Sequence, residues 1–230
     1  MTLVEIIRSI GDCIAPMMII SGQNLMEEWF TDLPAGYLVA RSETGYSNDE
    51  LALDYIRHFH HQAKGSIQGR NRFLLMDDYG SHNTYEVVTY ARGHGIHLYG
   101  LPPHTTHFLQ PLDVGCFQPL KHHHGQALDT AARYTGRGFT RTEFLAAIGQ
   151  IRHKTFTRRI IVGAWQKTGI VPFKPEVVLT WLRRQEVQAH EEAEHPYVNP
   201  SILDGPLERT LESLGGPSTG QSSPRTDDIY

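Results

Sequence analysis

Apolar runs that end in glycine, proline or aspartate recur along the chain, and they predict alternating strands and helices. Residues 2–8 and 13–20 are rich in β-branched side chains and are separated by Gly11 and Asp12, which predicts a β-hairpin. Three further elements are predicted before residue 60: a short helix, a short strand and a helix capped by Ser47 or Asn48, at 24–30, 37–40 and 49–59.

The middle of the chain has the pattern of a strand, a helix and a second strand in short succession. The first strand ends abruptly at Asp77, the helix is expected over 84–92, and the second strand over 96–101. This order predicts a βαβ unit with parallel pairing. Ligands of open α/β sheets gather at the carboxyl ends of strands, where both Asp77 and the segment leading to Asp113 emerge.

From residue 112 onward the spacing of apolar residues is that of helices, and this pattern fades toward the carboxy terminus. Helices are expected over 112–133, 140–156 and 157–168, and from residue 175 onward. After Glu186 the composition becomes acidic and rich in proline, glycine and serine, and residues 190–230 are predicted to be mostly disordered. The sequence therefore predicts one domain over 1–185 and a tail over 186–230.

Composition narrows the class of protein. Apolar residues make up 40% of the 230 residues, which is enough for a core. The only cysteines, Cys13 and Cys116, are too few for a disulfide framework and indicate a reducing compartment. No apolar run reaches the roughly 18 residues of a membrane span, so no membrane association is expected.

Charge is unevenly distributed along the chain. Residues 118–185 hold 12 Lys/Arg against 3 Asp/Glu, whereas residues 1–117 hold 7 against 13. A basic block of this strength suggests a surface that faces a polyanion, with a solvated basic helix face as the alternative. The candidate phosphate contacts are Lys121, Arg152, Lys154, Arg158 and Arg159.

Asp77 and Asp113, separated by 35 residues, are candidate ligands of a hard divalent cation. The alternative readings are a carboxylate that caps a turn and an ordinary helix-start residue. His104 and His107 have the spacing of a metal pair, but they follow Pro103 and are interpreted as loop residues that position the strand end or contact a phosphate. A histidine-rich metal-binding protein remains a weaker alternative.

Two motifs carry a resemblance to a known family. Residues 75–82 (LMDDYGSH) and 101–115 (LPPHTTHFLQPLDVG) resemble the DDE superfamily endonucleases, the catalytic domains of pogo/Tigger-type transposases and their jerky and centromere-protein-B-like relatives. Weaker similarities at 17–22, 42–48 and 164–173 extend the resemblance over roughly residues 2–185.

The resemblance implies an α/β fold of the RNase H-like, retroviral-integrase type, with a mixed sheet, flanking helices and a helical carboxy-terminal part. It implies DNA strand cleavage and transfer with two Mg²⁺ or Mn²⁺ ions and no small-molecule cofactor. Asp77 and Asp113 match the second and third carboxylates of the family triad, with Ser81, His82, His104 and His107 in supporting positions. DNA as partner and a nuclear location follow, and a homo-oligomer is left open.

The sequence also departs from the family pattern. The first catalytic aspartate of the family lies on a strand upstream of the hairpin that opens this chain, so the first strand is expected to be missing. Without that carboxylate we expect metal affinity and catalysis to collapse. Two hypotheses follow: an endonuclease whose complete gene supplies the missing residue, and a non-catalytic domesticated protein that binds DNA. The second is favoured for these 230 residues.

Overall fold

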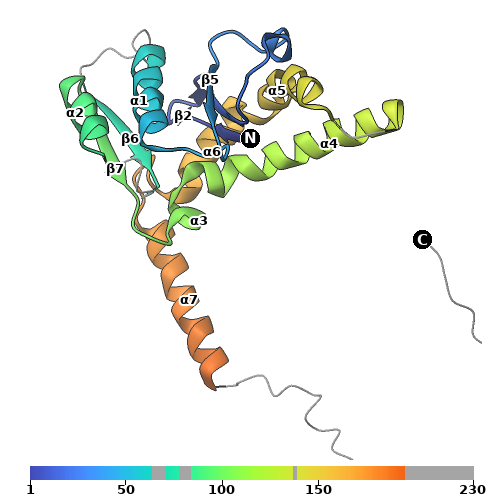
Figure 1. The fold of residues 1–230 in the computed structure, drawn as a ribbon. Coiled ribbons are helices and arrows are strands. Elements are labelled where there is room, and N and C mark those ends of the chain that lie inside the picture. The colour runs from blue at the N-terminus through green and yellow to red at the C-terminus, as the bar shows by residue number, and fades with distance from the viewer. Residues whose placement is uncertain (64–70, 78–83, 137–138, 195–230) are drawn as a thin grey trace, which may run out of the picture. The chain divides into compact units, whose positions relative to one another are not determined.

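The computed structural model describes residues 1–63, 71–77, 84–136 and 139–194. The chain divides into two compact units, Met1–Gln185 and Glu186–Tyr230. The first unit is a mixed α/β structure in which short strands are followed by helices (Figure 1).

The predicted hairpin is present and is divided into two ladders. Strand β1 (Thr2–Val4) pairs antiparallel with β4 (Met17–Ser21), and β2 (Ile7–Arg8) pairs antiparallel with β3 (Asp12–Cys13). Gly11 turns the chain between them with a φ of 97°, a conformation that favours glycine. The predicted strand after residue 37 is β5 (Leu38–Ser42), which pairs parallel with β4.

The strand–helix–strand prediction is confirmed by a second, smaller sheet. Strands β6 (Arg72–Met76) and β7 (Ile96–Gly100) are parallel, and α2 (Tyr85–Gly93) connects them. Side chains alternate along β6, so that Leu74 and Met76 are buried while Phe73 is 68% exposed.

Helix α1 (Asp49–Ala63) lies at the centre of the core. Asn48 caps it, because its Oδ1 accepts a hydrogen bond of 2.9 Å from the Leu51 N–H. Its buried face packs in one cluster with side chains of β4 and of β6, including Ile19 and Leu74. Among the described residues the two sheets, β1–β4–β5 and β6–β7, share this core but no hydrogen-bonded ladder.

The helices after β7 form the rest of the unit. They are α3 (Thr106–Leu109), the π-helical turn η3 (Leu112–Cys116), α4 (Phe117–Thr135), α5 (Arg141–Thr155), α6 (Arg158–Thr168) and α7 (Glu176–Glu194). The predicted capping box is present, since the Thr140 hydroxyl accepts from the Glu143 N–H and the Glu143 carboxylate accepts from the Thr140 N–H.

Three local predictions need correction. The helix expected at 24–30 is a single 3₁₀ turn, η1 (Glu27–Phe30), because Met26 remains 49% exposed and offers no buried stripe. The helix expected to run unbroken from 112 begins instead with the π-helical turn η3. Helix α7 continues to Glu194, beyond the predicted onset of disorder at residue 190, through glutamine, alanine and glutamate, which are good helix formers.

Candidate functional site

Asp77 directly follows the last residue of β6. The Met76 carbonyl accepts a hydrogen bond of 2.8 Å from the Leu101 N–H, which anchors this strand end to the residue after β7. The Asp77 side chain is half-buried. Its charge reaches the buried Tyr55 of α1: the pKa of that phenol is raised, mainly by burial and further by the Glu5 and Asp77 carboxylates.

Asp113 lies in the π-helical turn η3, between α3 and α4. The turn is closed by the Phe117 N–H, which donates to the Leu112 carbonyl five residues earlier. Such turns occur frequently at functional sites because they redirect single side chains. Sequence reasoning missed this turn, since a π-helical insertion leaves no distinctive residue pattern.

Electrostatic interactions link the two aspartates. Although Asp113 is an exposed residue, partial burial of its carboxyl group raises its pKa, and the Asp77 carboxylate raises it further. Lys121 and His107 act in the opposite direction and lower it. The fold therefore brings Asp77 and Asp113 within electrostatic reach of each other at one end of β6, with a lysine and a histidine nearby.

The predicted supporting residues have different positions. His107 is close enough to influence Asp113, and its ring contacts Trp181 of α7 with centroids 5.3 Å apart. Phe108 stacks on the same indole at 4.4 Å, so that α7 holds α3 beside the site. His104 is exposed and has a φ of 61°. Ser81 and His82, like Asp78, lie outside the described residues.

The structure corrects the prediction for Arg152. Its side chain is buried, and its guanidinium donates to both carboxylate oxygens of Glu5, to the Ile14 carbonyl and to the Tyr37 hydroxyl. Arg152 therefore stabilises the core and is not placed to contact a phosphate. The other predicted contacts, Lys121, Lys154, Arg158 and Arg159, are exposed.

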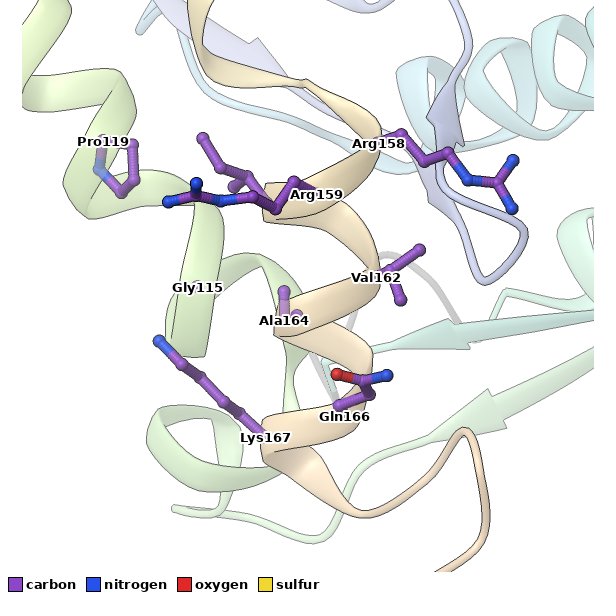
Figure 2. A pocket seen from close by; sticks show the side chains of 10 residues that line it. Gly115, Pro119, Arg158, Arg159, Val162, Ala164, Gln166 and Lys167 are labelled. Atoms are coloured by element: carbon purple, nitrogen blue, oxygen red, sulfur yellow. The ribbon is translucent and has the colours of Figure 1, made fainter.

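A hollow of about 820 Å³ lies beside the Asp113 segment, lined by residues of η3, α4 and α6 (Figure 2). Lys167 and Gln166 contribute to its wall, and sequence reasoning did not select either of them. The signal that could have selected Lys167 is its place eight residues after Arg159 on one helix, which puts the two side chains on neighbouring faces.

The two aspartates could supply some of the ligands of a hard cation. Carboxylate oxygens are the ligands that Mg²⁺ and Mn²⁺ prefer, and a cation between Asp77 and Asp113 would relieve the repulsion that raises the Asp113 pKa. In the described part of the chain, no group of three or more His, Cys, Asp or Glu side chains is arranged to hold a metal ion.

Comparison with known proteins gives a family match. Residues 1–165 match the profile of the DDE superfamily endonucleases. The MFS-type transporter clz9 of Cochliobolus lunatus is 30% identical over 182 residues, which are 79% of this chain and 20% of the relative. The chain thus spans about a fifth of the length of that relative, whose name refers to the whole protein. No solved structure matches the chain.

Across residues 1–63, 71–77, 84–136 and 139–194, no helix is both long enough and apolar enough to cross a bilayer.

Proposed function

This chain belongs to the DDE superfamily endonucleases, and we propose that it is a DNA-binding domain in which Asp77 and Asp113 hold a divalent cation. The observation that carries the proposal is the electrostatic interaction between the two carboxylates. Asp77 and Asp113 are 36 positions apart in the sequence, and the fold brings them close enough for the Asp77 charge to raise the pKa of Asp113. A divalent cation bound by both carboxylates would offset their mutual repulsion.

The chemistry of such a site follows from the charges around it. When bound, a divalent cation supplies a deprotonated water and shields a leaving oxygen in phosphodiester cleavage. Asp77 and Asp113 would hold it, while the charges of Lys121 and His107 favour the ionised form of Asp113. Two carboxylates are fewer than the family triad, so we expect these residues to bind DNA and cation without cutting DNA. A nuclear location is part of the same proposal.

Metal binding tests this proposal directly. We expect purified protein to bind Mn²⁺, measured by electron paramagnetic resonance, and Asp77→Asn or Asp113→Asn to weaken that binding by at least about tenfold. Asp129→Asn is the matched control, because Asp129 is an exposed acid of α4. Equal Mn²⁺ binding by all four proteins would remove the proposed site.

A second candidate function, DNA strand cleavage and transfer, is favoured by the divided sheet. Neither β1 nor β6 has a hydrogen-bonded strand on its outer edge among the described residues. A strand paired there could carry a third carboxylate close to Asp77. Nicking of supercoiled plasmid by this chain in Mg²⁺ or Mn²⁺, abolished by Asp77→Ala, would establish cleavage and overturn the non-cutting proposal.

A further inference from the structure

The hollow beside the Asp113 segment combines an apolar floor with cationic walls. Its floor is made where η3 meets α6: a Cβ atom on Gly115 would lie 2.5 Å from the Cβ of Ala164. Only a glycine allows this approach without displacing the helix. Gly115 follows Asp113 by two residues, so the hollow borders the same turn η3 that carries Asp113.

Two cations of α6 extend into the hollow from one side of the helix. Figure 2 shows Arg159 and Lys167 reaching toward the segment that carries Gly115 and Pro119, while the guanidinium of Arg158 extends to the opposite side. Lys167 lies near enough to η3 for its charge to lower the pKa of the Cys116 thiol, against the larger effect of burial. Lys167 therefore lies close to the turn that carries Asp113.

Neither cation is neutralised within the described structure. Arg159 and Lys167 are exposed, and neither forms an ion pair with a described carboxylate. Arg158 and Arg159 also occupy the first turn of α6, which contains no acidic residue. Positive charge at a helix amino terminus opposes the helix dipole. An anion bound at this end of α6 would offset the unfavourable interaction between the arginines and the helix dipole.

We propose that this hollow holds the phosphodiester backbone of duplex DNA, with Arg159 and Lys167 as the phosphate contacts. This proposal rests on the proposed function, because it takes DNA as the ligand of the neighbouring site. Eight helical residues span about 12 Å. That distance is larger than the spacing of neighbouring phosphates of one strand along the duplex axis, about 3.4 Å, so the two cations would contact different phosphates.

The chemistry of the hollow favours the DNA backbone over a folded acidic partner. The two cations reach across a floor of small apolar side chains, which suits contact with sugars between phosphates. Contacts of this kind carry no base information, so binding should be independent of sequence and sensitive to salt.

The test is binding of a short fluorescein-labelled DNA duplex, followed by fluorescence anisotropy in EDTA, so that the metal site has no part in the result. We expect Arg159→Ala/Lys167→Ala to bind at least about tenfold more weakly at low salt. The plot of log affinity against log salt should become shallower by about 2 for the double variant.

A control variant separates a defined site from diffuse charge. Arg92→Ala/Arg133→Ala removes the same charge from exposed positions of α2 and α4. It should retain affinity within about threefold. Equal losses in the control and test double variants would overturn the proposal, as would competition by polyglutamate equal to that by unlabelled duplex.

Loss of duplex binding at the hollow can be distinguished from loss of Mn²⁺ binding at the two aspartates. Asp77→Asn should keep duplex binding in EDTA while losing Mn²⁺, and Arg159→Ala/Lys167→Ala should keep Mn²⁺ while losing the duplex. Mn²⁺ binding by a protein that binds no duplex would overturn the hollow proposal alone. Duplex binding without Mn²⁺ would leave the hollow supported and the cation site refuted.

Discussion

Arg152 and Glu5 form a buried, bidentate ion pair between residues 147 positions apart in the sequence. The guanidinium Nε donates to Glu5 Oε1 at 2.7 Å, and Nη2 donates to Oε2 at 2.8 Å. Nη2 also donates to the Ile14 carbonyl at 3.0 Å. The pair thereby joins the last turn of α5 to the hairpin at the start of the chain.

Removing one member of this pair should destabilise the fold strongly. Arg152→Met leaves the buried Glu5 carboxylate without its partner, and breaking a buried ion pair in this way costs about 3–5 kcal/mol. We expect the free energy of unfolding, measured with urea, to fall by that amount.

The matched control is Lys154→Met, since Lys154 is exposed on the same last turn of α5. It should change stability by less than about 0.5 kcal/mol. Glu5→Gln/Arg152→Met should recover part of the loss, because no uncompensated charge then remains. A wild-type stability in Arg152→Met would show that the pair is not formed.

The contact between Gly115 and Ala164 gives a second prediction. Gly115→Ala places a methyl group 2.5 Å from the Ala164 Cβ, and overpacking of this kind typically costs about 1–3 kcal/mol. Thermal unfolding followed by circular dichroism should show a lower midpoint. The same variant should weaken duplex binding, because α6 is displaced from η3.

Gly125 of α4 provides the control, since a Cβ added there meets no atom within 4 Å. Gly125→Ala should stabilise the protein by about 0.5–1 kcal/mol through helix propensity. Gly115→Ala/Ala164→Gly should restore part of the lost stability by returning the space. If both alanine variants behaved alike, the close approach of the two segments would be refuted.

Neutralising Asp113 should stabilise the metal-free protein slightly. Its raised pKa means that the charged form is less favourable in the folded state than in the unfolded chain. Asp113→Asn should therefore raise the melting temperature in EDTA. Mn²⁺ should raise the melting temperature of wild-type protein and leave that of the variant unchanged. A variant that melts earlier than wild type in EDTA would contradict the proposed repulsion.

The buried thiol of Cys116 predicts a pH dependence. Burial, with small contributions from Glu5 and Cys13, raises its pKa to about 12. An unfolded cysteine ionises near pH 8.5. The folded state therefore binds this proton more tightly, and the stabilisation is complete below about pH 8.5 and lost progressively as pH rises toward 12.

The measurement compares unfolding free energies of wild type and Cys116→Ala between about pH 8 and pH 10. We expect wild-type stability to fall more steeply, by up to about 1.4 kcal/mol per pH unit above pH 8.5. In a Cys13→Ser background, thiol reagents should label Cys116 only after denaturant is added. Rapid labelling of native protein at pH 9 would contradict the burial of this side chain.

Asp77 and Asp113 could be selected as candidates from the sequence because their signals are local. Asp77 ends an apolar run, Asp113 lies in a distinctive motif, and the elements around them follow from periodicity and caps such as Asn48 and Thr140. Arg152 shows the limit of such reasoning. Its charge placed it in the basic block, but its role depends on Glu5, a partner that only the tertiary fold brings into contact.

Features created by packing were equally hidden from sequence reasoning. The π-helical turn at Asp113 has no residue signature, and the need for glycine at 115 depends on Ala164 from another helix. Lys167 stands out from other lysines only because α6 directs it toward η3 (Figure 2).

The shared core under the two sheets has a mechanical consequence. In the described residues β4 and β6 are joined by side chains packed on α1, without a backbone ladder between them. Side-chain packing yields more readily than a continuous ladder, so the two sheets can shift by small amounts relative to each other while α1 stays folded. Asp77 lies at the end of one sheet and Glu5 beside the other. A strand bound between the two sheets would therefore fix their relative position, and with it the distance between Asp77 and Asp113.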